Sequence, residues 1–148
     1  MRAEANEAKL DAVVQQCIAV RVRLLNRVIT KIFDDALRPV GLKVSQMNIL
    51  VAAWKLRLAN PQKICDVLHL DPSTLSRNVE RMRARGWLEV VPGADAREQP
   101  FRITAKGKAL LLKAQPAWEE AQAQAGKLLG KEGMALLART AKHLGMPG

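Results

Sequence analysis

Residues 71–104 read DPSTLSRNVERMRARGWLEVVPGADAREQPFRIT. This stretch predicts a helix, a strand, a charged turn and a second strand. Asp71 can accept hydrogen bonds from the free N–H groups of a first helical turn, and Pro72 stands where a missing N–H costs nothing. Gly86 ends the helix, and Pro92 with Gly93 separates the two strands. The rest of the chain can be interpreted outward from this unit.

The two faces of the predicted helix differ in chemistry. Leu75, Val79 and Met82 recur at helical spacing and predict a buried stripe. The opposite side carries Ser73 and Arg77, four residues apart, with Thr74, Ser76 and Arg81 flanking them. Such side chains suit contacts with phosphates and base edges. The alternative is an ordinary amphipathic helix followed by a surface hairpin.

The residues just before this helix predict a second, shorter one. Asn60 and Pro61 repeat the cap-and-proline start, and Leu70 leads directly into Asp71 and Pro72. Two short helices joined in this way form a helix-turn-helix, whose second helix enters the major groove of DNA. The same geometry also occurs in proteins that bind no DNA.

Helices are also predicted on both sides of this unit. Residues 7–38 predict one long helix of about 45 Å, and its apolar positions favour packing against a second copy of the chain. The alternative is a break into two shorter helices within one monomer. Ser45 is expected to cap a helix over residues 46–58 whose inward-facing side chains are Met47, Leu50, Val51 and Trp54.

The C-terminal third is expected to be helical as well. Thr104 caps a helix over residues 105–127, and Pro116 should kink or split it. Residues 130–133 form a break, and residues 134–144 form a last amphipathic helix. Both ends of the chain are thus helical and apolar, which favours an assembly surface built from the two termini.

The charge balance restricts the class of partner. The 148 residues carry 24 Lys+Arg against 14 Asp+Glu, a net charge of +10 that favours polyanions such as DNA, RNA or an anionic membrane. Aromatic residues are only 3%, which weighs against stacking platforms for single strands. No apolar run approaches the roughly 20 residues that span a bilayer, so we expect a cytoplasmic protein. The sequence contains no phosphate-binding loop, no paired catalytic carboxylates and no Ser/His/Asp arrangement. We therefore expect neither an enzyme nor a cofactor.

The motifs LDPSTLSRNVERMRARGWLE, DAREQPFRIT and AKGKALL, set in this order of elements, resemble the MarR family of winged-helix transcription regulators over nearly the whole chain. The resemblance implies a mainly α fold with a small β-hairpin wing, in one domain over residues 1–148. Residues 45–104 would be a winged helix-turn-helix DNA-binding lobe, and residues 7–38 and 105–148 would be N- and C-terminal dimerisation helices. The family implies a homodimeric regulator, often a repressor, that reads a pseudo-palindromic operator in double-stranded DNA. The alternative is a winged-helix module that uses this surface for protein contacts.

The resemblance also assigns roles by position. Residues 71–81 would be the recognition helix, with Ser73, Thr74, Ser76 and Arg77 facing the groove and Arg81 flanking them. Arg97 would lie at the wing tip and enter the minor groove, where the negative potential attracts a cation. Asp95 would orient Arg97 or brace the wing, because phosphates repel a carboxylate. Where many relatives have further basic residues, this wing has Ala94, Ala96 and Glu98.

Two cysteines do not make a disulfide framework. Cys17 falls on the apolar stripe of the first helix, where some relatives that sense hydroperoxides or hypochlorite carry a cysteine. A sensor thiol must be partly exposed and ionise readily, and Arg21, one turn later, would favour the thiolate. Those peroxide sensors support their cysteine with tyrosines, which this chain lacks, so plain packing of Cys17 is the alternative. Cys65 and His69 have a chelating spacing, but packing is the better interpretation and no metal is expected.

Relatives are often released from DNA by small amphipathic or aromatic acids. Such an effector would bind between the dimerisation helices and the helix-turn-helix. Arg21, Arg23 and Trp54 could line that cleft, because a cation and a ring suit an aromatic acid. The alternative is that Arg21 and Arg23 form salt bridges across the dimer.

Overall fold

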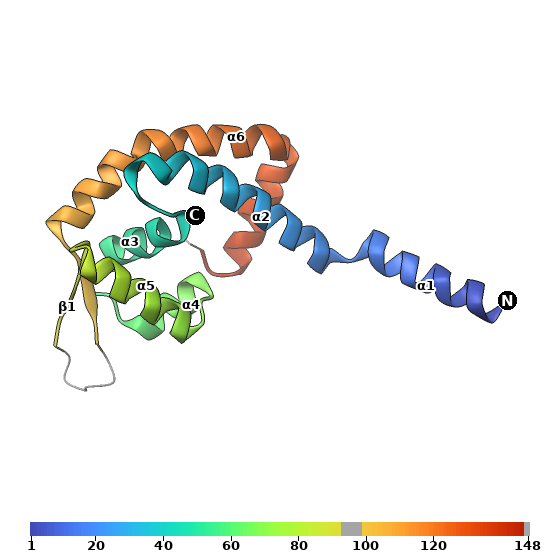
Figure 1. The fold of residues 1–148 in the computed structure, drawn as a ribbon, viewed down its shortest axis with the longest axis horizontal. Coiled ribbons are helices and arrows are strands. Elements are labelled where there is room, and N and C mark those ends of the chain that lie inside the picture. Colours follow the sequence, from blue (N-terminus) through green and yellow to red (C-terminus); the bar gives the residue numbers. More distant parts are fainter. Residues whose placement is uncertain (93–98, 147–148) are drawn as a thin grey trace.

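The computed structural model describes residues 1–92 and 99–146, and it confirms a mainly α fold with a β-hairpin wing. Figure 1 shows the order of the elements along the chain. The elements are α1 (Arg2–Gln16), α2 (Ile18–Leu37), a 3-10 turn η1 (Arg38–Val40), α3 (Val44–Leu56), α4 (Pro61–Leu68), α5 (Pro72–Ala84), β1 (Leu88–Val90), β2 (Phe101–Ile103) and α6 (Ala105–His143). Within the described residues, no helix is long and apolar enough to cross a membrane.

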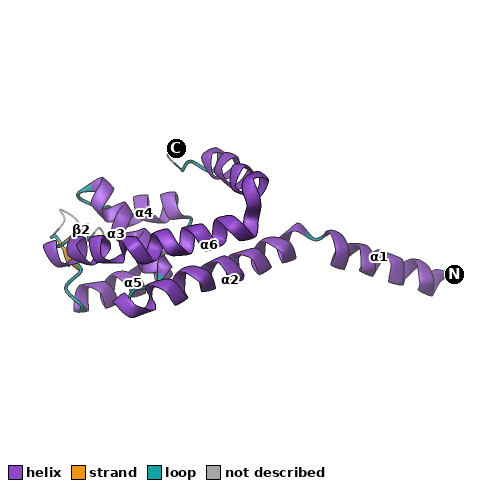
Figure 2. Cartoon of the chain, turned by 90° about the horizontal axis from the view of Figure 1, so that it is seen from above, coloured by secondary structure: helices purple, strands orange, loops and turns teal. Residues whose placement is uncertain are grey.

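The prediction of one long helix over residues 7–38 is wrong, because the chain breaks at Cys17. This residue has an extended backbone (φ −64°, ψ 109°) between α1 and α2. Figures 1 and 2 both show α1 projecting away from the other helices, and its apolar side chains Leu10, Val13 and Val14 are 61–76% exposed. Most helical stability in proteins comes from tertiary packing. Because the apolar side chains of α1 do not pack against the other described helices, tertiary contacts do not stabilise a continuous helix through Cys17 in the monomer.

Helices α2 and α6 lie side by side and form one layer of the molecule, as both views show (Figures 1 and 2). A small core joins them: Phe33 of α2 packs with Ala121 and Ala125 of α6. The two alanines are at most 4% exposed, and their small side chains let the helix backbones approach closely. Helix α3 packs against both helices of this layer, and β2 contacts α6.

The main core lies among α3, α4, α5, the hairpin and the first turns of α6. Its largest fully buried side chains are Leu37, Leu42, Ile49, Leu50, Ile64, Leu75, Met82, Leu88 and Phe101. Burying one side chain of this size stabilises the fold by about 1.5–3 kcal/mol. The predicted stripe of α5 is confirmed, since Leu75 and Met82 are buried and Val79 is half-buried.

Helix α3 begins at Val44 and ends at Leu56, so the helix predicted over residues 46–58 is present with both ends shifted by two residues. The predicted Ser45 cap is wrong. The start is capped from elsewhere: Asp34 of α2 accepts a hydrogen bond from the Val44 N–H at 2.8 Å, and the Gln46 side chain accepts one from the Lys43 N–H at 3.1 Å. The Asp34 carboxylate, ten residues before Val44, thus caps the helix in place of Ser45.

The inward face of α3 is also only partly as predicted. Leu50 is buried and Met47 half-buried, but Val51 and Trp54 are 41% and 57% exposed. The core instead takes Ile49 and Ala53, which lie on the side of the helix that meets the hairpin and α6. The apolar pattern of this helix is broad, and packing decides which side is buried.

Helix α6 begins as predicted, with the Thr104 hydroxyl accepting a hydrogen bond from the Gly107 N–H at 3.0 Å. Its first part runs to a break at Gly130, close to the predicted end near residue 127, and Pro116 does not split it. The residue with non-helical dihedrals is Gly130 (φ 68°, ψ 175°), which confirms the predicted break there. Proline removes one donor and disfavours the helix by about 3 kcal/mol. Buried Ala114 and Ala121, one on each side of Pro116, offset that cost by packing.

The hairpin pairs β1 with β2 in antiparallel register, with Leu88 opposite Ile103 and Val90 opposite Phe101. β1 covers residues 88–90 only, which is shorter than the stretch between Gly86 and Pro92 where the first strand is predicted. Ala59 bridges to Phe101 on the far side of β2, with N–H to carbonyl distances of 2.8 and 3.0 Å. This bridge ties the base of the wing to the segment that leads into α4.

Candidate nucleic-acid interface

The candidate interface is built around α5, and its N-terminal cap is confirmed. The Asp71 carboxylate accepts a hydrogen bond from the Ser73 N–H at 3.0 Å, and the Ser73 hydroxyl donates to the same oxygen. Hydrogen bonding by the Ser73 side chain, followed by its backbone N–H, holds the pKa of Asp71 below its ordinary value. The carboxylate therefore stays charged at the positive end of the helix dipole.

The outer face of α5 carries the side chains that the sequence proposed for DNA contact. Ser73, Ser76, Arg77 and Arg81 are exposed, and Thr74 is half-buried. In the described part of the chain, neither Arg77 nor Arg81 forms an ion pair, whereas Arg83 is bound to Glu80 at 2.9 Å. Two guanidinium groups one helical turn apart are thus available on the exposed face. Ser73 differs from the others, because its hydroxyl is already engaged with Asp71.

Helix α4 packs against α5. Asn60 caps α4 by accepting from the Gln62 N–H at 2.9 Å and the Lys63 N–H at 3.3 Å. His69 ends α4 in the left-handed region (φ 51°), and the Leu70 N–H then donates to the Cys65 carbonyl at 3.0 Å. This turn reverses the chain so that α5 starts at once, which is the helix-turn-helix that the sequence predicted.

The wing is braced at its base by a pair that the sequence analysis missed. Glu89 of β1 and Arg102 of β2 face each other across the hairpin, and their side chains form an ion pair at 2.5 Å. The sequence shows that Glu89 and Arg102 have opposite charges, but their pairing can be predicted only when the register of the two strands is known. Asp95 and Arg97, the predicted wing support and wing-tip contact, lie outside the described residues, so their predicted roles stay predictions.

A second connection that the sequence analysis missed lies at the other end of α5. Arg85 donates to the Gly41 carbonyl at 3.2 Å, and its guanidinium carbon lies 4.9 Å from the centre of the Trp87 ring. Gly41 lies 44 residues away in the sequence, so only the folded chain reveals its contact with Arg85. It links the C-terminal end of α5 to the turn that follows α2.

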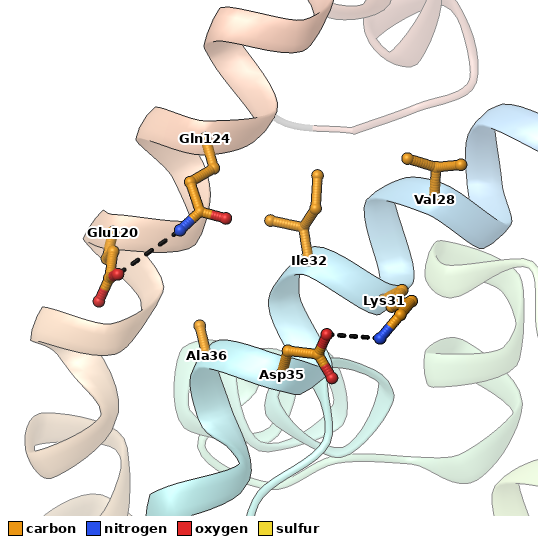
Figure 3. Close-up of a pocket in the computed structure, with 7 residues that line it drawn as sticks. All are labelled: Val28, Lys31, Ile32, Asp35, Ala36, Glu120 and Gln124. Carbon is orange, nitrogen blue, oxygen red and sulfur yellow. Dashed lines mark hydrogen bonds and ion pairs between the residues drawn. The ribbon is translucent and has the colours of Figure 1, made fainter.

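The predicted effector residues do not line the groove found between α2 and α6. Figure 3 shows that groove, a cavity of about 400 Å3 whose lining comes from Val28, Lys31, Ile32, Asp35, Ala36, Glu120 and Gln124. Asp35 points toward Lys31, with which it forms an ion pair at 2.6 Å. Arg21, Arg23 and Trp54 are exposed on α2 and α3. Their role in an effector cleft stays a prediction.

Cys17 is half-buried and stands at the break between α1 and α2, so its expected place inside a continuous helix is wrong. Arg21 donates to the Gln15 carbonyl. The redox role of Cys17 stays a prediction. Cys65 is 6% exposed, and burial raises the pKa of its thiol, in line with the packing interpretation. Among residues 1–92 and 99–146, no group of three or more His, Cys, Asp or Glu side chains could hold a metal ion.

Comparison with known proteins points to the same interface. A family model described as a winged helix DNA-binding domain matches residues 58–107, which run from the start of the helix-turn-helix to the first turn of α6. The transcriptional regulator MOSR of M. tuberculosis, solved in complex with DNA, is 32% identical to this chain. That match covers 88% of this chain and all of MOSR, with a TM-score of 0.71.

More distant structures share the fold. A mutant of MarR from E. coli, solved with operator DNA, has a TM-score of 0.78 and 20% identity, covering 91% of this chain and 98% of that one. BpsR of Bordetella bronchiseptica, whose DNA binding is regulated by 6-hydroxynicotinic acid, has a TM-score of 0.76 and 19% identity, covering 90% and 96%. The HTH-type transcriptional regulator YwoH of Bacillus subtilis is 28% identical over 78 residues. That alignment spans 53% of this chain and only 57% of YwoH.

Proposed function

Because the chain belongs to the MarR family of winged-helix transcription regulators, we propose that it is a homodimeric repressor that binds a pseudo-palindromic operator in double-stranded DNA. DNA binding through a winged helix-turn-helix is the property of the family. The family and fold are those of regulators, not of enzymes. A protein that works on the chromosome is expected in the cytoplasm.

The observation that carries the proposal is the exposed face of α5. Arg77 and Arg81 stand one turn apart on a helix capped by Asp71, and in the described part of the chain neither guanidinium is bound to a carboxylate. Arginine reads guanine edges through paired hydrogen bonds and also binds phosphates. We propose that Ser73, Thr74, Ser76 and Arg77 face the groove and that Arg81 flanks them. Arg97, supported by Asp95, would enter the minor groove.

We further propose that residues 45–104 act as the DNA-binding lobe and that the helices at both ends form the dimer. Large apolar side chains stay exposed on α1, α2 and the end of α6, including Leu10, Val14, Ile18, Leu24, Leu136 and Leu137. Monomeric proteins rarely leave this much apolar surface uncovered. A second copy that covers it would form an isologous interface and place two α5 helices on one face.

Relief of repression is proposed to come from a small aromatic or amphipathic acid or from oxidation of Cys17. Trp54 is 57% exposed on α3, a large apolar ring that a flat ligand can cover, and Arg21 and Arg23 would supply the charge. BpsR, a relative by fold, responds to an aromatic acid. 6-Hydroxynicotinic acid is thus a reasonable probe of the ligand route, and hydrogen peroxide with a Cys17→Ser variant is a probe of the thiol route.

The proposal is tested by measuring affinity for duplex DNA at several salt concentrations. A protein that contacts several phosphates should lose about 10³-fold or more in affinity between about 50 and 200 mM salt. A protein-interaction module without specific DNA binding, the alternative function, should show weak binding with no preferred sequence. Transcription in vitro from a promoter that contains the bound sequence then distinguishes repression from activation.

A further inference from the structure

One side chain connects the end of the recognition helix to two other parts of the fold. Arg85 is the C-terminal cap of α5. Its Nη1 donates to the Gly41 carbonyl at 3.2 Å, and its guanidinium carbon lies 4.9 Å from the centre of the Trp87 ring. A guanidinium over an indole face is attracted by the ring electrons, and its planar fork loses little freedom when it also donates a hydrogen bond.

The turn on the far side of this contact is fixed. Gly41 closes η1 directly after α2, with a left-handed backbone (φ 73°, ψ 23°) and a hydrogen bond from its N–H to the Arg38 carbonyl at 2.9 Å. A side chain here would be strained, because residues other than glycine disfavour this conformation. Leu37 and Leu42, on either side of the turn, are at most 2% exposed. The Gly41 carbonyl is therefore held in place by the main core.

The ring under Arg85 is fixed as well. Trp87 is 7% exposed, and its backbone N–H donates to the Met82 carbonyl of α5 at 2.9 Å. Its own carbonyl accepts from the Thr104 N–H at 3.0 Å and from the Thr104 hydroxyl at 3.1 Å, at the start of α6. Arg85 thus stands between the end of α2 and the start of α6, the two helices that we propose for assembly.

We propose that Arg85 is a positioning residue that sets the angle of α5 against α2, and thereby the separation of the two recognition helices in the dimer. This inference rests on the proposed function. α5 has 13 residues and is about 20 Å long. A rotation of about 5° at its C-terminal end would move its N-terminal end by nearly 2 Å. Hydrogen bonds to base edges weaken steeply with such displacements.

The inference differs from a direct role of Arg85 in binding DNA, because the two have different salt dependence. Removing a cation that neutralises a phosphate reduces the slope of log affinity against log salt by about 0.9. Removing a positioning contact leaves that slope unchanged, but it lowers affinity for the correct operator and reduces discrimination between half-site spacings. Spacing is a geometric property of the dimer.

The experiment compares Arg85→Ala with Arg85→Lys and with Arg83→Ala, which removes the same charge from the same end of α5. Affinity is measured for the selected operator and for duplexes with one base pair inserted or deleted between the half-sites. Arg85→Ala should weaken operator binding about tenfold, reduce the discrimination between spacings and keep the wild-type salt slope. Arg85→Lys should recover only part of the loss, because an ammonium group keeps the charge and can donate to Gly41 but lacks the planar fork that also covers Trp87. Arg83→Ala should resemble the wild type.

Hydrogen exchange in the absence of DNA tests whether Arg85 holds α5 to the Gly41 turn. Amides of residues 41–43 and of the last turn of α5 should lose protection in Arg85→Ala but not in Arg83→Ala. Unchanged protection, unchanged spacing discrimination, or a salt slope reduced by about 0.9 would each overturn the inference. Failure of the wild type to prefer any duplex would instead overturn the proposed function. The hydrogen-exchange result would still decide whether Arg85 holds α5 to the Gly41 turn.

Discussion

The Asp71 carboxylate accepts a hydrogen bond from the Ser73 N–H at 3.0 Å, and this contact closes the first turn of α5, the proposed recognition helix. The same oxygen also accepts from the Ser73 hydroxyl. The cap fixes the end of α5 that carries Ser76 and Arg77. This exposed carboxylate thus stabilises α5 and helps to place those side chains.

Replacing Asp71 by Ala should lower the thermal unfolding midpoint at neutral pH by a few degrees, while Asp71→Asn should lower it less because asparagine still accepts the hydrogen bond. Hydrogen bonding by Ser73 holds the pKa of Asp71 below its ordinary value. The carboxylate therefore stabilises the fold fully above the unfolded pKa of about 3.9. That contribution is lost as the pH falls through the lowered pKa. Circular dichroism melts of the three proteins should show their difference shrinking at acid pH, and a difference independent of pH would contradict the cap.

Arg77→Ala should weaken binding to the selected operator by about 1–3 kcal/mol and relax the sequence preference at one position of each half-site. The guanidinium is exposed on α5 and is available to a base edge. Fluorescence anisotropy against the operator and its single-base variants measures both effects. Arg83→Ala serves as the matched control, since Arg83 is already bound to Glu80. Equal losses in both variants would mean that only net charge matters.

Arg97→Ala should weaken binding to all duplexes by a similar factor and reduce the salt slope by about 1, because a wing-tip contact is electrostatic. The prediction comes from the position of Arg97 in the sequence motif. Affinities measured at several salt concentrations give the slope. A loss confined to one operator base pair, with the slope unchanged, would argue for base reading in place of a phosphate or minor-groove contact.

Gly107→Ala should destabilise the fold by about 1–3 kcal/mol, because overpacking forces neighbouring atoms apart. An added Cβ would clash with the Trp87 carbonyl and lie 2.8 Å from Cγ1 of Ile103. Gly126→Ala is the matched control on the same helix: nothing lies within 4 Å of its Cβ, and it should stabilise the protein by about 0.5–1 kcal/mol. Urea unfolding measures the change in the free energy of unfolding for both variants. If the two changes had the same sign, the close approach of α6 to Trp87 would be wrong.

Cys65 should react with a thiol reagent far more slowly than Cys17. Burial raises the pKa of the Cys65 thiol and leaves it 6% exposed, whereas Cys17 is half-buried at a break between helices. Mass spectrometry of the modified protein over time assigns each rate. In guanidinium the two rates should converge, and a fast Cys65 in the native protein would contradict its place in the core.

The parts of the fold that could be predicted from the sequence were set by local chemistry. Asn60, Asp71 and Thr104 cap helices through side chains two or three residues from the N–H groups they accept from, so the caps can be read directly. The start of α3 could not be read, because Asp34 supplies its cap from another helix. The exposure of Trp54 could not be read either, since tertiary packing chose the other side of α3.

The candidate site divides in the same way. The exposed face of α5 follows from a helical period, so Arg77 and Arg81 could be named in advance. The pair of Glu89 with Arg102 needed the hairpin register, and the contact of Arg85 with Gly41 joins residues far apart in the sequence. The break at Cys17 reflects the lack of packing on α1 in the monomer, which a continuous apolar pattern does not reveal.

The central claim, that two copies of α5 read one operator, is tested most directly by selecting bound sequences from random duplex DNA with the full-length protein. The account predicts enrichment of one pseudo-palindrome whose half-sites are about one helical turn apart, centre to centre. Arg77→Ala should relax it at one position of each half-site. A single unrepeated half-site, or no enrichment at all, would contradict the account.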